Sequence, residues 1–183
     1  MSTTAVATPV GTWSIDPSHS NVNFQVKHLG IATVRGPFNE FEGTLELAED
    51  LADSKAHGTV QVTSVDTNED GRDEHLRSAD FFDAEKYPQL TFESTEITQV
   101  DDDELEIAGD LTIHGVTKPI TFKAEITGTE EDPWGNQRVG LEVEGKLDRK
   151  EYGMTFNQAL GSGNVLVGDK VKLSLDISAV KAA

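Results

Sequence analysis

Apolar and polar residues alternate along most of the chain. Within residues 20–28, Val22, Phe24 and Val26 alternate with polar residues. A period of two places the two sets on opposite faces of a β-strand, so this segment predicts a strand with one buried face. The same pattern predicts strands at residues 41–47, 59–65, 90–93, 105–113 (as one strand or two), 120–126, 139–147 and 171–177.

Turn-forming or charged residues separate these segments. They predict turns at Gly30 and at residues 50–54, 101–103, 116–119 and 130–136. One helix is expected at residues 70–78, where Asp73 and Glu74 lie near the positive end of the helix dipole and Arg77 near its negative end. A second short helical turn is expected around residues 152–158.

The predicted strands are antiparallel, number about eight and form either a sandwich or a closed barrel. The barrel is favoured because it leaves no exposed edge strand, and the short connections favour an up-and-down order. The sequence therefore predicts an all-β fold, an eight-stranded antiparallel barrel with one or two short helical insertions. The chain has 183 residues, which corresponds to about one domain. We assign residues 12–181 to the barrel and residues 1–11 to a disordered leader.

The N-terminal segment and the overall composition bear on location. Residues 1–11 have neither a basic start nor the apolar stretch of a secretory signal, and no apolar run approaches the roughly 20 residues of a membrane-spanning helix. The chain has no cysteine, which excludes disulfides and thiol chemistry. We therefore expect a cytoplasmic protein without stable membrane insertion.

The charge of the chain is strongly negative. It has 15 Lys and Arg residues against 33 Asp and Glu residues, a net charge of -18. This charge opposes binding to phosphate backbones, so nucleic acid is not an expected partner. An outer barrel face is compatible with a homodimer, although no exposed apolar stripe identifies one.

The sequence offers little catalytic or metal-binding chemistry. No HExxH, GxSxG, Walker A or GxGxxG motif is present, so we expect no catalytic residues and no conventional cofactor. Residues 66–71 resemble the start of a calcium loop, but the twelfth position is Arg77 rather than the required Glu, so no metal site is expected. The side chains that titrate near neutrality are those of His19, His28, His57, His75 and His114.

Four of these histidines can be assigned expected surroundings. His28 ends the apolar row of residues 22–26, so its ring would turn inward, either to anchor a ligand or as a core-edge residue bonded to the backbone. His114 is expected at a solvent-facing turn. His19 and His57 are expected at the surface.

Residues 72–88 are the most distinctive segment. Leu76, Phe81, Phe82 and Tyr87 supply a large apolar area within a few turns. A helix and loop of this composition would plug one end of a barrel or line the mouth of a ligand site. The two roles are compatible, because a cap over the barrel end contacts whatever fills the interior.

Several sequence blocks together carry a family resemblance. They are FQVKHLG at residues 24–30, VRGPFNEFEG at 34–43, the segment 72–92, GDLTIHGVTKP at 109–119 and RKEYGM at 149–154. In this order, across residues 12–181, they resemble the YceI-like proteins, lipocalin-like barrels associated with the binding of polyisoprenoid lipids. The resemblance implies a barrel with a helical insertion, enclosing an elongated apolar tunnel for a prenyl chain.

The resemblance leads to a binding hypothesis. A polyprenyl or quinone-like lipid would bind by burial alone, because each buried CH₂ group contributes about 0.8 kcal/mol. Donors for a polar head would be His28, Arg72 and Arg149. We expect the lumen to be lined by Phe24, Val26, Phe92, Leu111, Ile113, Phe122, Leu141, Val143, Leu173 and Leu175, with Phe38, Phe41, Leu76, Phe81 and Phe82 near its ends.

Two alternatives remain open at this point. The first is an enzyme acting on an isoprenoid lipid, which would need an acid-base pair beside a wet reaction centre. The second is a stress or interaction module in which the same side chains pack against one another as an ordinary core.

Overall fold

A computed structural model describes residues 8–182 of the chain. Most of the expected leader, residues 1–7, lies outside the described residues. The first strand begins at Gly11, the last residue assigned to that leader, and the indole N–H of Trp13 donates to the carbonyl oxygen of Pro9 at 3.0 Å.

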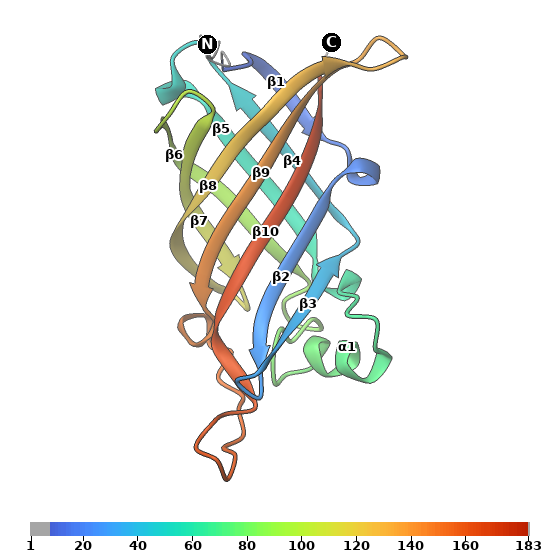
Figure 1. The fold of residues 1–183 in the computed structure, drawn as a ribbon, viewed down its shortest axis with the longest axis vertical. Coiled ribbons are helices and arrows are strands. Elements are labelled where there is room, and N and C mark those ends of the chain that lie inside the picture. The colour runs from blue at the N-terminus through green and yellow to red at the C-terminus, as the bar shows by residue number, and fades with distance from the viewer. Residues whose placement is uncertain (1–7, 183) are drawn as a thin grey trace.

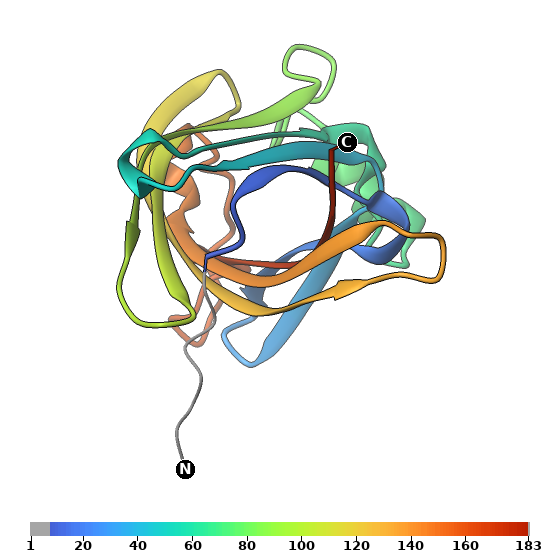
Figure 2. The same cartoon turned by 90° about the horizontal axis from the view of Figure 1, so that it is seen from above.

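One antiparallel sheet of ten strands makes up the fold. In the sheet the strands follow the order β1-β4-β5-β6-β7-β8-β9-β10-β2-β3, and β1 also pairs with β10, which closes the ring (Figures 1 and 2). The strands are β1 (Gly11–Ile15), β2 (Asn21–His28), β3 (Ala32–Phe38), β4 (Phe41–Leu47), β5 (Lys55–Gln61), β6 (Gln89–Gln99), β7 (Glu104–Ile113), β8 (Val116–Glu131), β9 (Gln137–Asp148) and β10 (Val167–Lys181).

Four of these ten strands combine in pairs, β1 with β2 and β3 with β4, and each pair forms one long strand with a short interruption. β1 and β2 both pair antiparallel with β10, β1 near its C-terminal end and β2 along residues 167–176, and the short 3-10 helix η1 (Pro17–His19) separates them. β3 pairs with β2 and β4 with β1, and only Asn39 and Glu40 lie between them. The ten strands therefore form a closed, up-and-down, eight-stranded antiparallel barrel, which confirms the predicted fold class.

Strict alternation explains the long strands. In β7, Leu105, Ile107, Leu111 and Ile113 are buried and face the interior, while most intervening residues are more exposed. The pattern that fades near Ile97 in the sequence has a structural cause, because β6 changes register between Ser94 and Glu96. Such a bulge shifts the side chains that follow it relative to a period of two.

One turn prediction and one strand prediction need correction. The segment 116–119 forms the start of β8 rather than a turn, because the chain reverses within His114 and Gly115, whose φ angles are 54° and 72°. Two left-handed residues suffice for a hairpin between paired strands. The strand predicted at 59–65 ends at Gln61 and continues as the 3-10 helix η3 (Val62–Ser64), where the N–H of Val65 bonds to the carbonyl of Val62.

The helical insertions lie close to their predicted positions. α1 (Asp70–Arg77) confirms the helix expected at 70–78, and Glu69 caps it by accepting from the N–H groups of Gly71 and Arg72. The second helical turn lies earlier than expected, as η4 (Arg149–Tyr152), and η2 (Leu51–Asp53) is a further 3-10 helix. No helix among residues 8–182 is long and apolar enough to cross a membrane.

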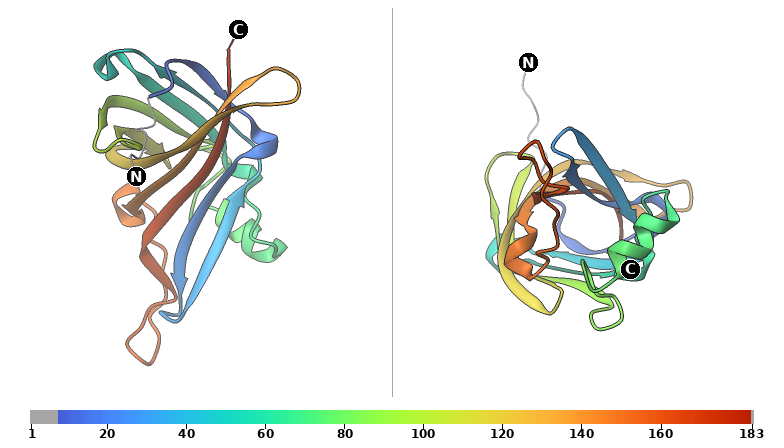
Figure 3. Two further views of the ribbon diagram at one scale, coloured as in Figure 1. Left: turned by 45° about the horizontal axis from the view of Figure 1, so that its top comes forward. Right: turned by 90° about the horizontal axis from the view of Figure 1, so that it is seen from below.

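The two ends of the barrel differ. The C-terminal end of β10 lies at the upper end in Figure 1, whereas α1 and the tip of the β2–β3 hairpin lie at the lower end. Seen from below, α1 and η4 flank opposite sides of the ring (Figure 3). We call the upper end of the barrel in Figure 1 the closed end and the lower end the α1 end. The closed end is filled by Trp13, Leu47, Ile97, Leu105, Ala124, Ile126 and Val139, all buried.

Candidate functional site

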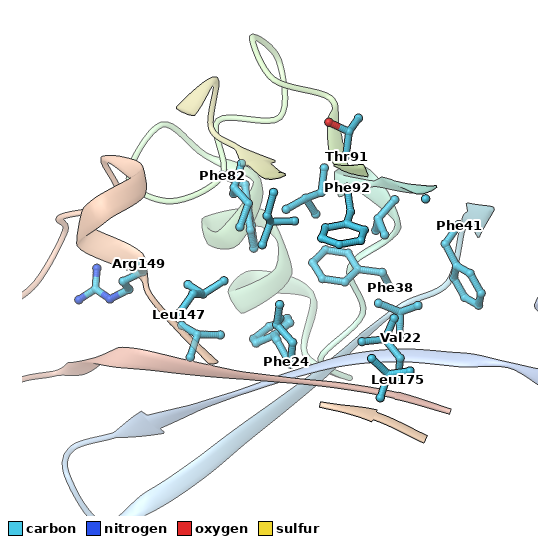
Figure 4. Close-up of a pocket in the computed structure, with 18 of the residues that line it drawn as sticks. Val22, Phe24, Phe38, Phe41, Phe82, Thr91, Phe92, Leu147, Arg149 and Leu175 are labelled. Atoms are coloured by element: carbon cyan, nitrogen blue, oxygen red, sulfur yellow. The ribbon is translucent and has the colours of Figure 1, made fainter. Parts of the chain in front are cut away.

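An apolar cavity of about 570 Å³ occupies the barrel interior between the closed end and α1. All sixteen side chains proposed from the sequence line it, and Figure 4 shows several of them pointing into the same space. From the strands these are Phe24, Val26, His28, Phe38, Phe41, Phe92, Leu111, Ile113, Phe122, Leu141, Val143, Leu173 and Leu175, and from α1 and the segment after it Leu76, Phe81 and Phe82.

Burial distinguishes this lumen from a packed core. Leu173 and Leu175 point inward from β10, yet both are only half-buried because open space lies in front of them. At the closed end, Leu105 and Val139 retain 0% and 1% of their accessible surface. The interior is therefore solid at one end and hollow along the rest, which contradicts the alternative of a fully packed core.

Aromatic rings form much of the lumen wall. Phe24, Phe38 and Phe82 make a cluster with centroid separations of 5.7 Å, 5.8 Å and 6.5 Å. Across the barrel, Phe92 and Phe122 meet edge to face at 5.1 Å. Three of these four contacts are edge to face and the Phe24–Phe38 pair is tilted, and such geometries favour defined ring orientations along the lumen wall.

Near α1 a third aromatic group ties two loops together. The ring of His75 on α1 lies 4.9 Å from that of Phe81 and 5.1 Å from that of Phe156. Phe156 belongs to the irregular segment that follows η4. The capping role expected of residues 72–88 is consistent with this arrangement, since the segment both covers the barrel end and lines the lumen.

Exposed polar residues join the lining at two places. Lys27, Arg72 and His75 do so at the α1 end, and Glu42 and His57 do so on the wall formed by β4 and β5. The middle of the lumen is apolar. Water and polar groups can therefore reach the cavity at its periphery, while its centre favours hydrocarbon.

Arg149 bonds to the protein's own backbone, so its role is structural and its guanidinium is not free to bind a ligand head. Its guanidinium is 3% exposed and donates to the carbonyl oxygens of Gly168, Met154 and Val167 at 2.8 Å, 2.7 Å and 3.3 Å. It points away from the apolar side chains in Figure 4. Burial lowers the pKa of Arg149, and the carboxylate of Asp169, 3.6 Å away, opposes this effect.

The guanidinium of Arg72 is also bonded within the protein, to Thr67. Its Nε donates to Thr67 Oγ1 at 2.7 Å and its Nη2 to the carbonyl oxygen of Thr67 at 2.6 Å. The buried Asp73 accepts from the N–H and the hydroxyl of the same threonine. The segment that resembles a calcium loop is thus bonded internally and orders the start of α1.

The histidines occupy distinct surroundings. His28 lines the cavity and is half-buried at the end of β2, as expected, while His19 and His57 are exposed. The expectation for His114 needs correction, because this residue is half-buried rather than solvent-facing. Its Nδ1 lies 3.1 Å from the carbonyl oxygen of Tyr152, and its ring packs at 5.0 Å against Tyr87.

Several lining residues escaped the sequence interpretation. Val60, Val171 and Ile177 follow the strand alternation and were recognisable from it. Other lining side chains lie in the segment 153–166, which has no periodicity, and only its tertiary position brings them to the lumen. They are Met154, Phe156 and Leu166.

A charged network stabilises the closed end. Arg138 on β9 donates from Nη1 to Asp16 at 2.9 Å and from Nε to Asp132 at 2.8 Å, and so joins the β1–β2 break to the β8–β9 hairpin. Bonds from Ser18, Arg138 and His19 hold the pKa of Asp16 well below its usual value. The bond from Arg138 lowers the pKa of Asp132 to about 2.

The fold and cavity define a class of protein, a hollow up-and-down β-barrel with an apolar lumen closed at one end. Within that class the particular family is clear. Residues 13–179 match the YceI-like domain, and the chain is 50% identical to protein YceI of Escherichia coli over 135 residues, which cover 73% of this chain and 70% of that protein. The chain belongs to the YceI family.

Solved structures agree with this assignment. The YCEI protein of Campylobacter jejuni superimposes with a TM-score of 0.73 at 30% identity, covering 86% of this chain and 90% of that one. A domain from Saccharophagus degradans described as polyisoprenoid-binding superimposes with a TM-score of 0.68 at 14% identity, covering 93% and 98%. The second likeness shows the same fold.

Proposed function

We propose that this protein binds or carries an elongated isoprenoid lipid, polyprenyl or quinone-like, in the barrel lumen, and that it does so without catalysis. The observation that carries the proposal is the apolar cavity of about 570 Å³, closed by packed side chains at one end. Cavities of a few hundred Å³ are the size of typical ligand sites. The description of the Saccharophagus degradans domain supports the choice of lipid.

Burial supplies the affinity in this proposal. Each buried CH₂ group contributes about 0.8 kcal/mol, so roughly ten carbons give about 8 kcal/mol, which corresponds to micromolar binding. The mutual packing of the aromatic rings lowers the cost of binding in this proposal, because side chains that are already packed need little ordering when the chain enters.

In this proposal the polar head of the lipid lies at the α1 end. Of the three donors proposed from the sequence, Arg149 and Arg72 already bond backbone oxygens, which favours His28 as the side chain that faces the head. In this proposal the tail extends toward the closed end, which Val139, Leu105 and their buried neighbours fill.

The distribution of polar groups favours a carrier over an enzyme. Acid-base catalysis needs a positioned titratable pair at hydrogen-bonding distance from the reacting group. Among the described lining residues, the titratable side chains lie at the periphery, and apolar residues such as Phe122, Leu141 and Leu173 form the central lumen. A chain held there meets only hydrocarbon.

Extraction of the native protein tests the proposal. Freshly purified protein is extracted with organic solvent and the extract analysed by mass spectrometry, in parallel with native mass spectrometry of the intact complex. We expect an isoprenoid lipid at close to one molecule per chain. Delipidated protein should then take up added prenol and release it unchanged. Recovery of only the apo mass, together with no uptake of prenol, would overturn the proposal, and chemical turnover of the prenol would favour the enzyme.

A further inference from the structure

Several glycines interrupt the inward-facing rows of side chains on the barrel wall, and three of them are buried. Gly36 on β3, Gly109 on β7 and Gly145 on β9 are buried at inward positions. A glycine inside a strand weakens the sheet and often marks a place where another group approaches the backbone closely. Their common position calls for a shared explanation.

Each of these glycines lies beneath a phenylalanine ring. A methyl carbon placed on Gly145 would stand 2.6 Å from two ring atoms of Phe122, and one placed on Gly36 would stand 2.5 Å from the ring of Phe24. A methyl carbon on Gly109 would stand 2.6 Å from the ring of Phe92. Real carbon contacts lie at about 3.5–4.0 Å, so each ring occupies the volume that any other residue's Cβ would fill.

The strand register explains two of these pairs. Gly36 is the direct partner of Phe24 across β2 and β3. Gly145 lies across from Phe122, one step from the paired residues Lys123 and Glu144, and its other neighbour is Leu173 on β10. Opposite side chains on one face of a sheet stand close together, so the missing side chain lets the neighbouring ring lie flat.

We propose that Gly36, Gly109 and Gly145 set the bore of the lumen by letting the rings of Phe24, Phe92 and Phe122 lie against the barrel wall, and that this bore is what admits a methyl-branched chain. The inference rests on the proposed lipid-binding function and adds the residues that determine which chains fit. A branched isoprenoid chain is thicker than a straight alkyl chain at every methyl group. A lumen with the rings turned inward would accept only the thinner chain.

Gly145 offers the sharpest test. Besides the Phe122 ring, the nearest atom to a methyl carbon there is Ile120 Cδ1, at an ordinary 3.5 Å. At Gly109 the added carbon would also collide with the backbone oxygen of Glu93, and at Gly36 with Thr67. In Gly145→Ala the ring of Phe122 must therefore move by about 1 Å to restore normal contact.

The packing directs that movement into the lumen. On the side away from Gly145, Phe122 is paired with Ile107 on β7, and the ring of Phe92 stands 5.1 Å away. Both neighbours block a sideways shift. The open space is the cavity itself, so the ring narrows it.

The experiment compares the natural protein with Gly145→Ala, with Gly145→Ala/Phe122→Leu and with Gly161→Ala. Gly161 is a matched control, because no atom lies within 4 Å of its methyl position and its φ is not positive. Native mass spectrometry of delipidated protein measures the affinity for geranylgeraniol and for the unbranched saturated alcohol of equal main-chain length. Crystal structures of the ligand-free proteins show the position of the Phe122 ring.

We expect Gly145→Ala to lose at least about tenfold in affinity for geranylgeraniol, in line with the usual effect of overpacking, and much less for the straight alcohol. The double variant should regain geranylgeraniol binding, and Gly161→Ala should match the natural protein. Equal losses for both alcohols, or no loss, would overturn the inference. If the natural protein binds neither alcohol, the lipid-binding proposal fails. The crystal structures still test the role of the glycines, because a Phe122 ring that stays against the wall in Gly145→Ala would refute the proposal that Gly145 sets the width of the lumen.

Discussion

Replacing Val143 by phenylalanine tests whether the interior is hollow. Val143 points inward from β9, is half-buried, lines the cavity, and pairs with Ala124 and Leu175 on the neighbouring strands. The new side chain brings about four more carbons, which would contribute up to roughly 3 kcal/mol if fully buried. Partial burial and lost rotamer freedom reduce this gain to about 1 kcal/mol. The lipid-free variant should therefore be as stable as the natural protein, or slightly more stable.

Val139 provides the matched control on the same strand and the same face. It lies at the closed end, is 1% exposed and does not line the apolar cavity. Phenylalanine in a packed site costs about 1–3 kcal/mol because neighbours and backbone must shift. We thus expect Val143→Phe and Val139→Phe to differ by about 2–4 kcal/mol in the free energy of unfolding.

Denaturant unfolding of delipidated protein measures these free energies, and prenol binding is measured in parallel. Val143→Phe removes space for about four carbons of a bound chain, so prenol affinity should fall by about 100-fold. Equal destabilisation by the two substitutions would show that Val143 sits in a packed core, and the reasoning from the cavity would be refuted.

Three further predictions concern the barrel ends. The pKa of Asp132 is lowered to about 2 by Arg138, so the contribution of this carboxylate to stability is complete above about pH 4 and is lost as the pH falls toward 2. Asp132→Asn should therefore be less stable than the natural protein at neutral pH. It should also lose less stability between about pH 4 and pH 2, as measured by acid titration followed by circular dichroism. Arg149→Met removes a donor from the carbonyl oxygens of Gly168, Met154 and Val167, of which that of Val167 keeps a bond from Asn157 Nδ2. The substitution should lower the unfolding free energy by about 3 kcal/mol, and a change below about 1 kcal/mol in urea unfolding would contradict the structural role of Arg149. Phe82→Ala removes one ring of the cluster near α1 and should speed prenol release severalfold in stopped-flow displacement, whereas an unchanged rate would show that prenol leaves by another route.

The strand pattern was readable wherever one face is buried along a whole segment. The segments 41–47 and 139–147 were assigned to within a few residues because period-two alternation follows directly from burial of one face. β3 escaped, because Gly36 and Pro37 interrupt its alternation. The turn predicted at 116–119 lies instead at His114 and Gly115, because a two-residue reversal depends on backbone angles that many sequences can adopt.

The cavity residues were predictable as a set, but the cavity itself was not. Alternation and the family resemblance together identified inward residues such as Phe122 and Leu173. They could not distinguish an inward side chain that faces open space from one that touches a neighbour, and Val139 and Val143 look alike in the sequence. The hydrogen bonds from Arg149 to backbone oxygens could not be predicted from the sequence either, because the acceptors lie on β10 and after η4.

The amino-acid order by itself determined the all-β class, the inward row of each regular strand, the helix at α1 and the family, since these follow from local periodicity, capping and matching motifs. Tertiary structure alone decided that β1 and β2 share the edge of β10, that one end of the barrel is solid and that the remainder is hollow. The physical reason is that empty volume belongs to no single residue. It arises from the distances between side chains on opposite walls, and those distances depend on how the closed ring positions every strand at once.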